Sequence, residues 1–191
     1  MPNWKGIVGK SFTPATFATY VGKLTFPQWR PQFIVVHNTG DPTLYKWKTL
    51  SGDRWMKGLE RYYRDEQHWS AGPHLFVADD LIWVFTALDT PGVHSPSWNG
   101  VAWGVEIVGD YDHEPFSAAS STNALSALTT LHAAIGLDPG TLRFHKEDPK
   151  TTHKNCPGVN VKKAALVKEL RSRLVLESAG EHAAARTIIP A

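Results

Sequence analysis

The pattern of apolar and polar positions predicts strands and helices in alternation along the chain. Phe33 to Val36 is a continuous apolar run, which is typical of a strand buried on both faces. Apolar runs at 74–78 and 81–85 flank Asp79-Asp80, and this arrangement predicts a hairpin. Residues 101–108 alternate in size and polarity, as in a strand whose two faces differ. Together these segments supply the strands of a sheet.

Helices are predicted where apolar residues recur every three or four positions. Thr13-Pro14 is a start signal, because threonine caps a helix and proline fits its first turn. Helices are expected at 52–68 and at 118–135, the second stopped by Gly136, and Asn160 is the expected cap of a last helix. The side chains expected to face the core are Phe17, Tyr20 and Val21; Trp55, Leu59, Tyr62 and Tyr63; Leu125, Leu128, Leu131 and Ile135; and Leu166, Leu170 and Leu174.

Two segments lack this periodicity. Residues 87–100 are rich in Pro, Gly, Ser and Asn and predict a long loop, and the Ala-rich residues 178–191 predict a flexible C-terminal tail. We see no internal repeat and no linker between domains. We therefore expect a single α/β domain over residues 1–177, with a central mixed β-sheet flanked by helices.

Composition narrows the class of protein. With 42% hydrophobic and 20% charged residues among 191, the chain can bury a core without covalent staples. The net charge of +2 is too small to predict nucleic-acid binding. One cysteine excludes an intramolecular disulfide, and no apolar run approaches the ~18 residues of a membrane span. Because the N-terminus lacks an apolar signal region, we expect synthesis in the cytoplasm without a signal peptide.

The best candidates for chemistry are His37, His145 and Cys156. His37 ends the apolar run, and strand ends hold functional side chains on a rigid scaffold. Pro157-Gly158 predicts a turn that places Cys156 at a loop edge. Each residue alone fits a core position, but two imidazoles and a thiolate together can fill three of zinc's four tetrahedral positions and leave one for water.

Glu106 and Lys154 are the candidates for acid/base and charge-stabilising roles. Glu106 shares a strand face with Ala102 and Gly104, and these small neighbours predict open space in front of the carboxylate, as on the floor of a cleft. The alternative is an ordinary outward residue of a half-exposed strand. Lys154 lies two residues before Cys156.

Further candidates are expected to bind substrate. His94 lies in the long polar loop near Trp98 and Asn99, and exposed tryptophans such as Trp98 or Trp47 can stack on sugars. His74 is a weaker candidate, because a core role suits it at least as well. Solvated positions are expected for the remaining histidines, His68, His113, His132, His153 and His182.

Several segments, taken in order, resemble the type 2 N-acetylmuramoyl-L-alanine amidases. That family includes phage endolysins, bacterial cell-wall amidases and peptidoglycan recognition proteins. The segments are 34–39 around His37, 70–77 around His74, 104–109 around Glu106, and 145–158 with Lys154 and Cys156. The likeness runs from about residue 30 to residue 160, and the chain departs from the family in its stretched His145–Cys156 loop.

The resemblance implies an amidase type 2 fold with zinc held by His37, His145 and Cys156. It implies that Glu106 and Lys154 are catalytic, the lysine stabilising an oxyanion and favouring the Cys156 thiolate. It also implies peptidoglycan or muropeptides as the partner of a monomer, with His94 in the groove wall. Family members without a cysteine or aspartate ligand bind peptidoglycan without cutting it, and this chain has Cys156, so hydrolysis of the amide between N-acetylmuramic acid and L-alanine is expected here.

Other functions remain open at this point. A non-catalytic peptidoglycan-binding module is one. A thiol hydrolase using Cys156 is another, although Pro157 removes a backbone N–H that an oxyanion hole often uses. A zinc endopeptidase is a third, although no His-Glu-x-x-His motif occurs. An amidase would be an endolysin that acts on the cell wall after release, or a cytoplasmic muropeptide-recycling enzyme.

The last predicted helix is rich in cations. Lys162, Lys163, Lys168, Arg171 and Arg173 are expected to point outward. We hypothesise that this basic face holds the protein near anionic wall or membrane polymers.

Overall fold

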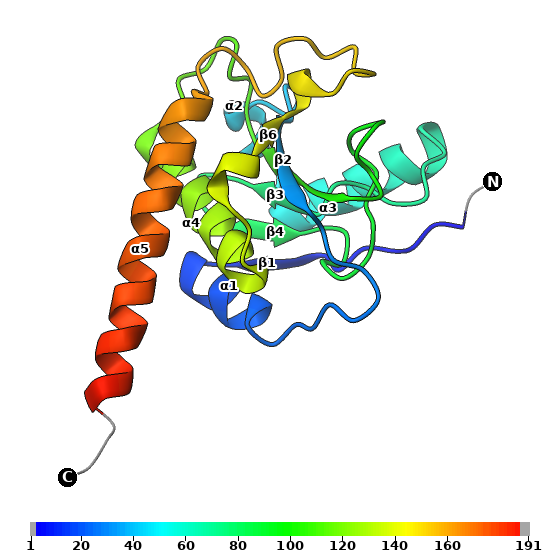
Figure 1. The fold of residues 1–191 in the computed structure, drawn as a ribbon. Coiled ribbons are helices and arrows are strands. Elements are labelled where there is room, and N and C mark those ends of the chain that lie inside the picture. The colour runs from blue at the N-terminus through cyan, green and yellow to red at the C-terminus, as the bar shows by residue number, and fades with distance from the viewer. Residues whose placement is uncertain (1–2, 188–191) are drawn as a thin grey trace.

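A six-stranded mixed sheet forms the centre of the computed structural model, which describes residues 3–187 (Figure 1). The strand order is β1-β4-β3-β5-β2-β6. β4 is antiparallel to β1 and β3, whereas β3, β5, β2 and β6 are mutually parallel. The strands are β1 Lys10–Phe12, β2 Phe33–Asn38, β3 Leu75–Val77, β4 Ile82–Val84, β5 Ala102–Ile107 and β6 Arg143–Phe144. The predicted mixed-sheet α/β architecture and the predicted hairpin are therefore confirmed.

Three helices cover one face of the sheet: α1 (Pro14–Val21), α4 (Ala118–Ile135) and α5 (Lys163–Thr187). α1 starts as predicted, with Thr13 Oγ1 accepting from the Thr16 amide and Pro14 in the first turn. α4 has the predicted bounds and ends at Gly136 in the left-handed conformation, at φ 64°. The predicted inward leucines of α4 are buried against alternate residues of the strands, including Ile34, Val36, Trp103, Val105 and Ile107.

The opposite face is covered by α2 (Leu44–Trp47), α3 (Gly52–Arg61) and a π-helical turn, η1 (Tyr62–Glu66). Met56 and Tyr63 pack on the sheet, in an aromatic cluster with Phe76, Trp83 and Phe85. The prediction that Tyr62 faces the core is wrong, because it is 43% exposed. It lies seven residues after Trp55 on the same face of the helix, and this face borders a cavity rather than the sheet.

α5 differs from its prediction at both ends. It begins at Lys163, and Asn160 is not its cap, because Asn160 Nδ2 donates to the Glu114 carbonyl at 2.9 Å instead. Leu166 and Leu170 are buried as predicted, but Leu174 is only half-buried. The helix continues to Thr187, so residues 178–187 of the predicted flexible tail are helical, and 188–191 lie outside the described residues. Alanine is the strongest helix former, so an Ala-rich segment needs no packing face to continue a helix.

The remaining short elements are the 3₁₀ turns η2 (Pro139–Thr141) and η3 (His145–Glu147). Among the residues described, no helix has the length and apolar character that crossing a membrane requires.

Candidate active site

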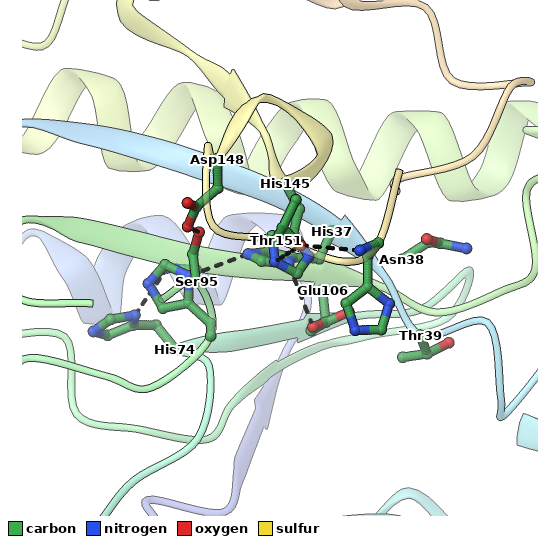
Figure 2. A network of polar contacts seen from close by, with 12 residues as sticks. His37, Asn38, Thr39, His74, Ser95, Glu106, His145, Asp148 and Thr151 are labelled. Carbon is green, nitrogen blue, oxygen red and sulfur yellow. Dashed lines mark hydrogen bonds and ion pairs between the residues drawn. The ribbon is translucent and has the colours of Figure 1, made fainter. Parts of the chain in front are cut away.

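The sheet itself brings the first site residues together. Parallel strands end at the same edge, and β2 and β5 pair with His37 opposite Glu106. β6 pairs Phe144 with Val36, so His145, the next residue, lies beside His37. Their imidazole centroids are 4.4 Å apart. Figure 2 shows that His37 from β2, Glu106 from β5 and His145 from the turn after β6 point toward one another.

Cys156 reaches this edge from the loop between η3 and α5. Its carbonyl accepts from the Lys146 amide at 3.1 Å, which fastens the loop next to His145. The predicted turn follows, with Gly158 at φ +102°, and a Cβ there would lie 2.5 Å from a backbone atom of Tyr111. Glycine therefore allows the loop to pack closely enough for Cys156 to join the histidines.

The ligand atoms of His37, His145 and Cys156 lie within 4.8 Å of one another. Burial lowers the pKa of His37, and it lowers that of His145 to about 4, so both rings are neutral as metal ligation requires. Burial raises the pKa of the Cys156 thiol, so a metal would have to displace its proton. Two neutral imidazoles and one thiol are a donor set that fits zinc.

Glu106 faces the same space from β5. Burial raises its pKa to about 8. Oε1 lies 3.9 Å from His37 Nδ1, and Oε2 is buried without a hydrogen-bond partner. A buried carboxyl group that titrates near neutral pH and has an unused oxygen suits acid/base catalysis on a bound molecule.

Gly104, one of the small neighbours of Glu106, has the His94 ring beside it. A Cβ on Gly104 would lie 2.3 Å from His94 Cγ. Gly104 therefore accommodates a buried imidazole, whereas the open space lies in front of Glu106, as predicted.

A cavity of about 1280 Å³ extends outward from these residues. Trp55, Gly58, Leu59 and Tyr62 of α3 and η1 form one of its walls, at the spacing of a single helix face. Nothing lies within 4 Å of the position that a Cβ on Gly58 would occupy. Further lining residues are Asp41, Lys46, Asp110, Asp112, His153, Lys154 and Asn155.

The model of the family described as N-acetylmuramoyl-L-alanine amidase (Amidase_2) matches residues 27–159, more than half of the chain. The chain belongs to this amidase family. No match was found among curated protein sequences.

Solved structures of similar fold agree with this membership. An endolysin N-acetylmuramoyl-L-alanine amidase from Clostridium intestinale is 22% identical, with a TM-score of 0.58 over 75% of this chain and 85% of that chain. Drosophila PGRP-LB is 19% identical, with a TM-score of 0.59 over 72% and 80%. Drosophila peptidoglycan recognition protein SD is 15% identical, with a TM-score of 0.60 over 84% of each chain. At these identities the likeness shows the fold alone.

The fold of this amidase-family chain brings most of the predicted site residues to one place. His37, Glu106, His145, Cys156 and His94 all line the cavity. Lys154 also lines it, with an exposed side chain. The cation that opposes the raised pKa of the Cys156 thiol is Lys146, whereas the sequence had suggested Lys154 for that role.

Three predicted substrate-binding residues lie outside the cavity lining. Trp98 packs edge-to-face on Phe33, with ring centroids 5.5 Å apart. Asn99 Oδ1 accepts from the His94 and Ser95 amides at 2.7 Å each and shapes the loop. His74 is fully buried, and it joins β5 to the loop because its Nδ1 accepts from the Gly104 amide at 3.0 Å and its Nε2 lies 3.0 Å from the Thr90 carbonyl. Trp47, the other tryptophan suggested for sugar stacking, is buried beneath Trp55, and His132, expected in solvent, is fully buried in α4.

Sequence reasoning missed two residues that shape the site. Buried Asp148 accepts from Ser95 Oγ at 2.5 Å and from the Ser97 amide at 2.9 Å, so it joins the His94 loop to the His145–Cys156 loop. Burial alone would raise its pKa, but the hydrogen bonds from Ser95 and Ser97 outweigh it and lower the pKa to about 2. Thr151 Oγ1 lies 2.9 Å from His145 Nε2. An aspartate and a threonine in a polar loop carry no sequence signal for either contact.

Proposed function

We propose that the chain is a zinc-dependent N-acetylmuramoyl-L-alanine amidase that hydrolyses the amide between N-acetylmuramic acid and L-alanine in peptidoglycan. The observation that carries the proposal is the convergence of His37, His145 and Cys156 within 4.8 Å of one another, beside the unpartnered Oε2 of Glu106. Membership of the amidase family supplies the substrate class.

His37, His145 and Cys156 would hold the zinc ion. Zinc supplies Lewis-acid polarisation of the amide carbonyl and lowers the pKa of a bound water. Glu106 Oε2 accepts a proton from the attacking water and then delivers it to the departing amide nitrogen. Its raised pKa, near 8, makes both transfers feasible near neutral pH. Lys154, exposed at the cavity, offers its ammonium group to the negative charge that develops on the carbonyl oxygen.

The alternatives have less support. A thiol hydrolase needs a thiolate, but burial raises the pKa of the Cys156 thiol. A binding module without catalysis needs neither a complete set of metal-ligand atoms nor a buried carboxylate oxygen that lacks a hydrogen-bond partner. For the biological setting we propose a monomeric endolysin that acts on the cell wall, in keeping with the Clostridium intestinale endolysin of similar fold.

The test combines metal analysis with product identification. Purified protein should contain one zinc per chain, a chelator should abolish hydrolysis, and mass spectrometry of digested peptidoglycan should reveal cleavage at the N-acetylmuramoyl-L-alanine bond. Cys156→Ser should lose zinc and activity together. Full zinc content and full activity in Cys156→Ser would refute the ligand assignment, and cleavage within the peptide cross-links would refute the substrate bond.

A further inference from the structure

A chain of hydrogen bonds between buried groups leads from the backbone of β5 to His37. The Ala102 carbonyl lies 3.1 Å from His94 Nε2, and His94 Nδ1 lies 3.1 Å from His37 Nε2. His37 and His94 are 2% and 6% exposed. We propose that His94 is a positioning residue that fixes the tautomer and orientation of His37, so that His37 presents the lone pair of Nδ1 to the metal site.

The donors and acceptors in this chain follow from the carbonyl at its end. A carbonyl oxygen only accepts, so His94 Nε2 carries a hydrogen and donates to Ala102. In a neutral imidazole the other nitrogen is then an acceptor, so His94 Nδ1 accepts from His37 Nε2–H. His37 Nδ1 is left with a free lone pair on the side where Glu106 Oε1 lies 3.9 Å away. The opposite tautomers would face a lone pair toward the carbonyl.

His94 is itself held on several sides. Its ring packs over Gly104, where any Cβ would lie 2.3 Å from Cγ, and its amide donates to Asn99 Oδ1 at 2.7 Å. The next residue, Ser95, donates to Asp148 at 2.5 Å, which ties His94 to the loop that carries His145 and Cys156. The acceptor for His37 is thus fixed relative to both the sheet and the other two ligands.

This inference rests on the zinc site of the proposed function. The second nitrogen of a ligating histidine is commonly held by such a partner, and its loss lowers metal affinity by about 10–100-fold. Without His94, either nitrogen of His37 is able to carry the hydrogen, and only a fraction of the molecules presents Nδ1.

The decisive experiment reads the His37 tautomer in zinc-free protein by NMR of ¹⁵N-labelled histidine rings. We expect hydrogen on Nε2 of His37 and of His94 in the unmutated protein. Hydrogen on Nδ1 of His37 would overturn the proposal, whether or not any variant folds. Because no zinc is present, this result is independent of whether the protein is a zinc amidase, which zinc binding by the unmutated protein tests separately.

Variants test the consequence for metal affinity. His94→Leu should mix the His37 tautomers and weaken zinc binding about 10–100-fold in a chelator competition. His94→Asn keeps an acceptor near the position of Nδ1 and should recover part of both effects. His132→Leu is the matched control, because it removes a fully buried imidazole from α4, and it should leave the tautomer and zinc affinity unchanged. Unchanged zinc affinity in folded His94→Leu would overturn the proposal, and so would zinc affinity in His94→Asn that is no better than in His94→Leu.

Discussion

At the scale of single residues, burial is what makes the carboxyl group of Glu106 suited to acid/base chemistry. Glu106→Gln keeps the shape of the side chain but removes the titrating group whose pKa burial raises to about 8. We expect zinc content and fold to be retained and turnover to fall by about 10²–10⁴-fold, the usual contribution of one positioned acid/base. Steady-state kinetics on a purified muropeptide, with zinc measured on the same sample, checks this. Near-normal turnover would move the acid/base role elsewhere.

The sequence predicted these residues unevenly. His37 and Glu106 were recognisable because each ends or interrupts a regular strand pattern, and Cys156 because Pro157-Gly158 marks a turn. The contact between Asp148 and Ser95 was not predictable, since the two residues are 53 positions apart in polar loops. The sequence also did not reveal why residue 104 is a glycine, because the His94 ring that packs against it comes from a loop with no periodicity.

At the scale of elements, α4 has a stop signal that is purely conformational. Gly136 adopts φ 64°, and nothing lies within 4 Å of the position of an added Cβ. Gly136→Ala should therefore lower the free energy of unfolding by about 1 kcal/mol through backbone strain alone. Gly100→Ala is the matched control, because that position also has open space but not the left-handed φ. Equal urea midpoints for the two variants would contradict this account.

α4 also contains a buried histidine that should make stability depend on pH. Burial lowers the pKa of His132, whose Nδ1 lies 2.7 Å from the Leu128 carbonyl and whose Nε2 has no partner. The unfolded chain, with a pKa of about 6.5, then binds the proton more readily, so stability falls as pH drops below that value. His132→Leu should flatten this part of the pH dependence, as measured by urea unfolding at about pH 7.5 and about pH 5. An identical loss of stability on acidification in parent and variant would assign the dependence to other groups.

Elements with a sustained pattern were predictable, and short ones were not. The 118–135 helix had enough turns to define its inward face and its stop. β1 and β6 have three and two residues, too few for a period to appear. The 52–68 helix was predicted, but an apolar stripe does not reveal whether it faces a sheet or a cavity, which is why Tyr62 was misplaced.

At the scale of the whole molecule, the basic face of α5 is weaker than its sequence suggests. Lys163 pairs with Glu147 at 2.7 Å, Arg173 with Glu169 at 3.1 Å, and Arg171 with Asp138 at 3.8 Å. These partners offset part of the positive charge that would attract an anionic polymer.

Charge reversal tests what attraction remains. Reversing Lys168, Arg171 and Arg173 should lower the rate on intact sacculi at low salt and reduce its salt dependence, while the rate on a soluble muropeptide holds. Reversing exposed Lys10, Lys23 and Lys57 makes the same change in net charge away from α5, and it should have a smaller effect on sacculi. Equal rates on sacculi for the α5 variant and its parent would contradict a role for the basic face in holding the protein near anionic polymers.

Gly58, in the wall of the cavity, limits the folding stability of the protein. Glycine inside a helix is less stable than alanine by about 0.5–1 kcal/mol, and within residues 3–187 nothing lies within 4 Å of a Cβ added to Gly58. Alanine at this position would therefore strengthen α3 while taking room from the cavity between Trp55 and Tyr62. Stability and cavity space therefore favour different residues at position 58, alanine for the first and glycine for the second.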